Sequence, residues 1–329
     1  APTGETPSQY EVLTEADPES VCRQLMGATA GAVLDQRSFD AVLQDRRDAW
    51  GQATVYGLSV AFADAADSWP ESSQASSWSP RLLVNVFNGA LHAYTNPVFS
   101  DFPEFLLAPV TGASIERQVD VIRVLLAQSR TLLSELDTVS VNGHLVSDPL
   151  GEPNHAVMEL VRTLLADRDE ANGFAAWIDA SAGDLVTPHG YQLPISGIEL
   201  SVEGLIEYWI GFAHKWGLNY LEDPLAERDG DAWRQLRERL PAECKLVADN
   251  LVSGDLARLG EHEGALDAVL VKPDQCGTVT NTADLVAAAR GADLEVVLSH
   301  RSVETDCLAL VHLAAGLEID LIKIGPFQG

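Results

Sequence analysis

Six short apolar segments in the second half of the chain each end in a polar or charged residue. In chain order these residues are Asp179, Glu222, Asp249, Lys272, His300 and Lys323. They follow one another at 23 to 43 positions, close to the interval between the strands of a parallel β/α barrel, which carries its chemistry at the strand ends. Three carboxylates come first and basic residues follow. The pattern therefore predicts that acids hold a divalent cation while basic groups hold an anion or take a proton.

The three acidic residues have two interpretations. A single aspartate after an apolar run is more often the N-cap of the following helix. Three carboxylates at the ends of successive strands instead favour a hard cation such as Mg²⁺, which prefers oxygen ligands. Because Asp179, Glu222 and Asp249 share this position and basic residues follow them, the metal site is the stronger prediction.

The basic residues also have functional and ordinary interpretations. Lys272 follows the apolar run 268–271 and could act as a base if nearby cations lower its pKa, or could be a surface lysine. The His300-Arg301-Ser302 run supplies donors suited to phosphate or carboxylate, or could be an exposed turn. Lys323 lies within an apolar strand, where an ammonium is costly unless it faces a polar centre, so a functional role is favoured there.

The elements around these residues alternate between strands and helices, which predicts an α/β fold with a parallel sheet. Two early strands, 82–87 and 105–108, precede two amphipathic helices at 115–133 and 155–166. Six further strands are then predicted at 174–179, 218–222, 245–249, 267–272, 294–299 and 320–324, with helices near 203–215, 231–239, 255–262, 281–290 and 305–316. Eight strands can close a barrel.

The N-terminal part has a different character. Residues 1–20 read as a flexible arm, 38–67 as a helical region, and the serine-rich stretch 71–79 as a linker. We therefore expect a small N-terminal region over 1–79 and the barrel over 80–329.

The composition limits the classes of partner. The chain has 329 residues and a formal charge of −28, from 21 basic and 49 acidic residues, which argues against nucleic acid or an anionic membrane as a partner. The four cysteines are isolated, no apolar run reaches membrane-spanning length, and the given residues do not open with the basic-then-apolar pattern of a signal peptide. We expect a cytoplasmic protein with reduced thiols that meets a small anionic substrate through local cations or metal.

Several local sequences resemble motifs of the enolase family, in the same order along the chain from about residue 30 to the end. The family's E-D-P, D-D-L, K-x-N-Q-I-G-T, S-H-R-S and I-K-T-G motifs match segments that begin at Glu222, Asp249, Lys272, Ser299 and Ile322. Upstream, the segments beginning at Asn85 and Pro103 resemble N-V-L-N-G-G-S-H-A and Q-E-F-M-I-A-P. The S-H-R-S motif is highly specific.

This resemblance implies an enolase-type TIM barrel, ββαα(βα)6, with a reduced N-terminal capping segment. It implies that Asp179, Glu222 and Asp249 ligate Mg²⁺, with two metal sites in total, and that Lys272 removes the proton next to the substrate carboxylate. Lys323 would stabilise the resulting charge, Arg301 and Ser302 would hold the phosphate and a second Mg²⁺, and active-site positions of the family match His92, Glu104 and His300. A lysine base acting with Mg²⁺ on an ene-diolate is characteristic of enolase-superfamily sites. A homodimer is the family expectation.

The chain also departs from the family. The glutamate that helps the hydroxyl leave corresponds to Pro149, and the glutamine before Glu104 corresponds to Pro103. Three residues are inserted between His92 and Glu104, and the family's N-terminal sheet, mobile loop and last helix have no visible counterpart. These differences predict either a reduced paralogue or an incomplete chain.

The sequence therefore predicts a Mg²⁺-dependent lyase or related enolate-forming enzyme that acts on a phosphorylated or phosphonylated three-carbon acid. The altered leaving-group side favours a divergent enzyme of phosphonate metabolism, similar to carboxyphosphonoenolpyruvate synthase. Two alternatives stay open: ordinary dehydration of 2-phosphoglycerate to phosphoenolpyruvate, and a non-catalytic anion-binding or structural barrel.

Overall fold

The computed structural model describes residues 16–72, 78–89, 96–110, 113–166, 173–301 and 307–325. The chain forms two compact units. The first comprises the described parts of Ala1–Trp78, Val252–Glu263 and Val269–Asp320, and the second those of Ser79–Leu251, Gly264–Ala268 and Leu321–Gly329. No helix within the described ranges is long and apolar enough to cross a membrane.

Eight strands form the closed barrel that the sequence predicts. They are β1 (Arg81–Gly89), β3 (Glu104–Pro109), β6 (Phe174–Asp179), β10 (Tyr220–Glu222), β11 (Lys245–Ala248), β12 (Ala268–Val271), β13 (Glu295–Ser299) and β14 (Leu321–Ile324). Their hydrogen-bonded order is β14-β13-β12-β11-β10-β6-β3-β1, and pairing of β1 with β14 closes the ring. The α/β class and the ββαα(βα)6 order are confirmed.

The second strand of the barrel runs against its neighbours. β3 pairs antiparallel with both β1 and β6, whereas β1 with β14, β6 with β10, and β10 with β11 are parallel. The N-terminal end of β3 therefore lies beside the C-terminal end of β6, which pairs Glu104 with Asp179.

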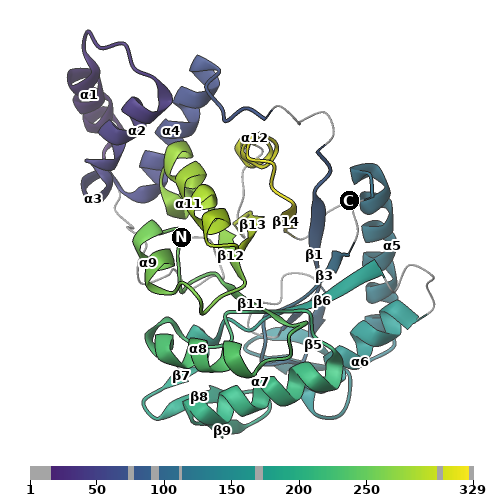
Figure 1. The fold of residues 1–329 in the computed structure, drawn as a ribbon. Helices are drawn as coiled ribbons and strands as arrows, with labels where there is room; N and C mark the ends of the chain where they lie inside the picture. Colours follow the sequence, from purple (N-terminus) through teal and green to yellow (C-terminus); the bar gives the residue numbers. More distant parts are fainter. Residues whose placement is uncertain are drawn as a thin grey trace. The chain divides into compact units, whose positions relative to one another are not determined.

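The predicted helices form with small shifts of their ends. They are α5 (Ile115–Ser134), α6 (Pro153–Ala166), α7 (Val202–Trp216), α8 (Gly230–Arg239), α9 (Leu256–Glu261), α11 (Val279–Gly291) and α12 (Ala309–Gly316). α5 contacts β1 and α6 (Figure 1). Ser114 and Ser201 cap the N-termini of α5 and α7, and Gly217 ends α7 in the left-handed conformation.

The N-terminal region contains more helix than the sequence predicts. The helix α1 (Pro18–Thr29) begins inside the predicted arm, where Asp17 accepts a hydrogen bond from the Ser20 amide. The predicted helical region 38–67 consists of α2 (Gln36–Gln44), α3 (Arg47–Trp50) and α4 (Gln52–Ala66). Gly51, at φ 80°, separates α3 from α4. These helices share a small core that contains Val21, Phe39, Leu43, Trp50 and Val55 (Figure 1, purple).

Several short strands were not predicted. β4 (Asp137–Val141) and β5 (His144–Asp148) form a hairpin whose Asn142-Gly143 turn has φ values of 48° and 82°, a signal that the sequence does contain. β2 (Pro97–Val98) pairs with β1 and β5. A separate sheet consists of β7 (Val186–Thr187), β8 (Gly190–Leu193) and β9 (Ile198–Leu200). Their brevity hides any alternation of apolar and polar residues.

The end of β1 requires a residue without a side chain. A Cβ atom on Gly89 would lie 2.0 Å from the Phe102 carbonyl oxygen and 3.2 Å from the Pro103 Cα. Because backbone atoms cannot turn aside, we expect Gly89→Ala to lower the free energy of unfolding by about 1–3 kcal/mol. Urea denaturation monitored by circular dichroism measures this. The control Gly211→Ala, at an uncrowded site within α7, should raise stability by about 0.5–1 kcal/mol; similar effects of the two substitutions would contradict the assignment.

Candidate active site

Strand pairing places three carboxylates side by side in the second unit. Glu104 at the start of β3 is in register with Asp179 at the end of β6, and Asp179 is in register with Glu222 at the end of β10. Asp249 follows β11 directly. Glu222 is completely buried, and Asp179 and Asp249 are also buried. Asp179, Glu222 and Asp249, three of the strand ends that the sequence singles out, are thus neighbours in space within this unit.

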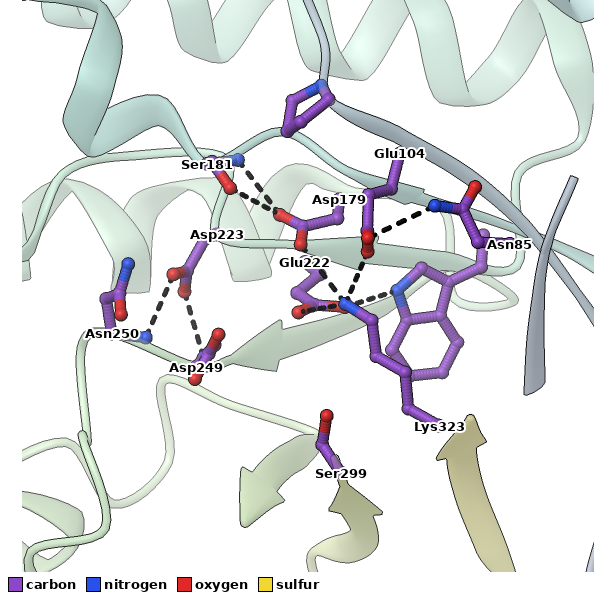
Figure 2. Close-up of polar contacts among 12 residues, drawn as sticks. Asn85, Glu104, Asp179, Ser181, Glu222, Asp223, Asp249, Asn250, Ser299 and Lys323 are labelled. Carbon is purple, nitrogen blue, oxygen red and sulfur yellow. Dashed lines mark hydrogen bonds and ion pairs between the residues drawn. The ribbon is translucent and has the colours of Figure 1, made fainter. Parts of the chain in front are cut away.

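Lys323 on β14 brings its ammonium group into the middle of these carboxylates (Figure 2). Its Nζ lies 2.8 Å from Glu104 Oε2, 2.9 Å from Glu222 Oε1 and 3.2 Å from Asp179 Oδ2. The Lys323 side chain is only 8% exposed, so water solvates its positive charge only weakly. Lys323 thus faces a polar centre, the condition under which the sequence favours a functional role for a lysine in an apolar strand; that role stays a prediction.

The charges in this cluster shift one another's pKa. Burial alone would lower the pKa of Lys323, but Glu104, Glu222 and Asp179 outweigh it and raise that pKa well above its usual value. Burial raises the pKa of Glu222, and the charge of Asp179 raises it further, although Lys323 opposes both. The ammonium therefore stays charged without neutralising the surrounding carboxylates completely.

Asp223, the aspartate of the E-D-P segment that begins at Glu222, organises the loop beside the cluster. It directly follows β10 and has φ 43°, a left-handed conformation that aspartate tolerates better than most residues. Its carboxylate accepts hydrogen bonds from the Asp249 amide and the Asn250 amide, each at 2.9 Å (Figure 2). Burial, together with the charges of Asp249 and Asp179, raises the pKa of Asp223, and the two amides oppose that shift.

Three further residues orient the carboxylates. The Asn85 amide donates to Glu104 Oε1 at 3.1 Å, and the Trp177 indole donates to Glu222 Oε2 at 2.8 Å. Ser181 donates to Asp179 Oδ1 through both its amide and its hydroxyl group, each at 3.0 Å. Composition and periodicity carry no signal for these roles, because the contacts join residues that are distant in the sequence or lie in an irregular turn.

The donor set suits a divalent cation in its chemistry. Asp179, Glu222 and Asp249 carry buried carboxylate oxygens, the donor type that such cations prefer. No group of three or more His, Cys, Asp or Glu side chains within the described ranges is arranged to hold a metal ion. The Lys323 ammonium contacts two of the predicted ligands, Asp179 and Glu222.

The remaining predicted site residues belong to the first unit or fall outside the described residues. Lys272 directly follows β12 and is buried, and His300 directly follows β13. Arg301 is also buried, and its Nη1 lies 3.5 Å from Asp274 Oδ2. His92 and Ser302 lie outside the described residues.

Comparison with known proteins identifies the family. The sequence profile described as "Enolase, C-terminal TIM barrel domain" matches residues 78–328, more than half of the chain. The chain belongs to the enolase family. It is accordingly an enolase-superfamily enzyme, as the motifs predict.

Individual enolases are distant relatives. The enolase of Ehrlichia ruminantium (strain Gardel) is 28% identical over 313 residues, which cover 90% of this chain and 73% of the relative. The enolase of Ehrlichia chaffeensis is 29% identical over 255 residues, which cover 76% of this chain and 59% of the relative. The profile match shows the family, and these relatives are similar to the chain over most of its length.

Removal of the Lys323 charge tests the electrostatics of the cluster. Lys323→Met leaves buried carboxylates without their ammonium partner, so we expect the free energy of unfolding at neutral pH to fall by about 3–5 kcal/mol. The Lys323 charge opposes the rise in the pKa of Glu222, so in the variant that pKa should rise further, and folded Lys323→Met should bind more protons than the folded unmodified protein as the pH falls. The deficit should therefore shrink as the pH falls from 8 toward 5.

Urea denaturation across this pH range, without added metal, measures the effect. Lys215→Met removes an exposed lysine of α7 and serves as the control, with little expected change at any pH. A pH-independent deficit for Lys323→Met would contradict the described electrostatics.

Proposed function

We propose that this protein is a Mg²⁺-dependent enzyme that removes the proton next to the carboxylate of a phosphorylated or phosphonylated three-carbon acid. The observation that carries the proposal is the Lys323 ammonium at the end of a barrel strand, in contact with the buried Asp179 and Glu222 and the half-buried Glu104. A proton next to a carboxylate is very weakly acidic, so its removal requires positive charge that is already oriented where the new negative charge develops.

Each polar residue has a proposed role. Asp179, Glu222 and Asp249 would hold Mg²⁺, and Arg301 and Ser302 would hold the phosphate or phosphonate group. Bound Mg²⁺ supplies positive charge that stabilises the enolised carboxylate. Lys272 would take the proton, and Lys323 would balance the negative charge that develops on the substrate carboxylate. His92, Glu104 and His300 match active-site positions of the family and would also belong to the site.

The side of the site that handles the leaving group favours a divergent reaction. Pro149, which corresponds to the family's glutamate, has no group that could donate a proton to a departing hydroxyl. The neighbouring Leu150 is apolar, with φ 60° and an exposed side chain. Among residues 148 to 150, Asp148 at the end of β5 is the one with a carboxyl group. We therefore propose a role in phosphonate metabolism, similar to that of carboxyphosphonoenolpyruvate synthase.

The N-terminal region and the assembly are part of the same proposal. Residues 1–79 would form a reduced capping region and residues 80–329 the barrel. The negative charge and isolated cysteines support a cytoplasmic enzyme, and the family supports a homodimer with a small anionic substrate as ligand.

An exchange experiment separates proton removal from loss of the hydroxyl. The protein is supplied with Mg²⁺ and 2-phosphoglycerate deuterated at C2, loss of the label is followed by NMR, and phosphoenolpyruvate is followed by absorbance. We expect exchange without product. Release of phosphoenolpyruvate would instead identify an ordinary enolase, and neither exchange nor product would favour another substrate or the non-catalytic barrel.

Replacement of the proposed base gives a direct test. Lys272→Met should lower the exchange rate at least about 100-fold, because no other group is proposed to take the proton. Lys215→Met, on the exposed surface of α7, should leave the rate unchanged. Exchange that survives in Lys272→Met would show that another residue is the base.

Metal binding can be tested without activity. Mg²⁺ that binds only the folded protein raises its melting temperature. Asp249→Asn should weaken the affinity for Mg²⁺ at least about tenfold, because even mutation of residues that merely orient metal ligands has an effect of this size. Calorimetric titration measures the affinity. Asp231→Asn changes a fully exposed carboxylate of α8 and should leave the affinity unaltered; equal losses in both variants would indicate nonspecific binding to an acidic protein.

A further inference from the structure

The segment Pro273–Thr278, which directly follows Lys272, is held by the N-terminal helices of the first unit. It contains the short helix α10 (Pro273–Cys276) and leads into α11, with Thr278 as the N-cap residue. α10 and α11 both contact α4, and α11 also contacts α2. Asp40, Gln52 and Ser59 of these helices are polar and buried, and buried polar groups need hydrogen-bond partners.

The first contact is a cap that the N-terminal helices supply to α11. The Ser59 hydroxyl oxygen accepts from the Val279 amide at 2.9 Å, and the Asp40 Oδ2 atom accepts from the Thr280 amide at 2.9 Å. The Thr278 hydroxyl oxygen accepts from the Asn281 amide at 3.0 Å. The first three amides of α11, which have no partner within the helix, are thus all satisfied, two of them by residues about 220 to 240 positions away.

The buried Asp40 is itself held in place from two sides. Its Oδ1 atom accepts from the Ser59 hydroxyl at 2.7 Å and from the Gln36 side-chain amide at 2.9 Å. Asp40 is only 1% exposed, and burial of a carboxylate is costly unless hydrogen bonds compensate it. Its negative charge also lies at the positive end of the 13-residue helix α11.

The second contact reaches the segment itself. The buried Gln52 side chain donates to the Gln275 carbonyl oxygen, and Gln44 donates to the Cys276 carbonyl oxygen at 3.4 Å. Arg47 donates to Gln52 Oε1 at 2.9 Å and orients its amide. Gly277 has φ 88°, and a Cβ atom there would lie 3.2 Å from Gln44 Nε2.

The segment in turn contacts a second proposed site residue. Asp274 Oδ2 lies 3.5 Å from Arg301 Nη1, and the Arg301 side chain is 8% exposed. The segment therefore begins directly after Lys272, the proposed base. It also carries Asp274, which contacts Arg301, the residue proposed to bind the phosphate group.

We propose that Asp40, Ser59 and Gln52 are positioning residues for Lys272 and Arg301. They hold the Pro273–Thr278 segment so that the base and the anion-binding guanidinium keep a fixed geometry. This inference rests on the proposed function, because it gives the N-terminal helices a part in proton removal. The physical need is strict, since a displacement of about 1 Å in a reacting group can lower a rate about 100-fold.

Attachment of the helices by itself does not require this buried network. On the exposed surface, Arg37 of α2 already forms two hydrogen bonds with Asp284 of α11, at 2.7 and 2.9 Å. Val55 of α4 is fully buried in the apolar core of the N-terminal helices. A buried carboxylate that bonds the first turn of α11 adds orientation, because hydrogen bonds have directional requirements that apolar contacts lack.

The test uses Asp40→Asn in the full chain. The asparagine keeps the shape but replaces one accepting oxygen with a donating amide group, which conflicts with the amides and hydroxyl that Asp40 binds. We expect the C2 deuterium exchange rate with Mg²⁺ and 2-phosphoglycerate to fall about 10–100-fold, while KM changes much less than kcat. Lys272 is also labelled with formaldehyde and cyanoborohydride, and the labelling is measured by peptide mass spectrometry. In Asp40→Asn, the pH dependence of this labelling should differ from that of the unmodified protein.

Two controls separate positioning from simple attachment or stability. Arg37→Gln removes the exposed contact between the same two helices and should leave exchange and Lys272 labelling unchanged. Val55→Ala should lower the melting temperature through a core cavity, without changing exchange per folded molecule. If Asp40→Asn does not fold, Ser59→Ala replaces it, with the same direction of effect expected.

The outcomes distinguish the two proposals. If the unmodified protein shows no exchange, the proposed function fails, and the positioning role is decided by Lys272 labelling and by hydrogen exchange of the amides in 274–278. If Asp40→Asn or Ser59→Ala matches the unmodified protein in exchange, labelling and amide protection, the positioning role is overturned. It is also overturned if Val55→Ala lowers exchange per folded molecule as much as Asp40→Asn does.

Discussion

The burial of one ammonium group among carboxylates is the constraint on which the second unit of this protein depends. Lys323 contacts Glu104, Asp179 and Glu222 in an environment from which water is largely removed. An ammonium or a carboxylate alone would be very costly there, and each makes the other tolerable only with close contact and added hydrogen bonds. Asn85, Trp177 and Ser181 supply such bonds to the carboxylates. The strands must therefore keep their register for the core to remain stable.

Register is also what turns a stable core into a candidate site. Because β3 runs antiparallel to β6, the first residue of β3 lies opposite the last residue of β6, and Glu104 joins carboxylates from strands that run the other way. Asp223 then fixes the start of the following loop through the amides of Asp249 and Asn250. The carboxylates thus come from separate strands but form one charged group, which is the usual way in which barrel enzymes assemble their chemistry.

In the first unit, the same principle operates through the backbone. The helices α2 and α4 contact the segment after Lys272 through the side-chain amides of Gln44 and Gln52, and Asp40 and Ser59 complete the first turn of α11. Buried polar groups of this kind must be satisfied in one arrangement, since an unmade hydrogen bond in a dry interior costs more than a made one contributes. The helices thereby restrict the segment more tightly than apolar packing alone would.

Much of the architecture could be predicted from local sequence. The apolar runs that end in Asp179, Glu222, Lys272 and His300 identify strands and their C-terminal ends, and the motifs that begin at Glu222 and Ser299 identify the family. The order of eight strands also follows, because strand and helix periodicities are local properties of the chain. The hairpin β4–β5 was missed although its Asn142-Gly143 turn is visible in the sequence, and the proposed roles of the site residues stay predictions.

Only the tertiary structure decided which charged and polar side chains contact one another. Nothing local indicates that Lys323 contacts Glu104, more than 200 positions earlier, or that Asp40 would bond the amide of Thr280. Such contacts depend on strand register and helix packing, which are set by the whole core at once. The sequence by itself determined the elements, the residues at their ends and the family; folding determined how burial, charge and hydrogen bonding combine those residues, because electrostatic energies depend on distance and solvent exposure rather than on separation along the chain.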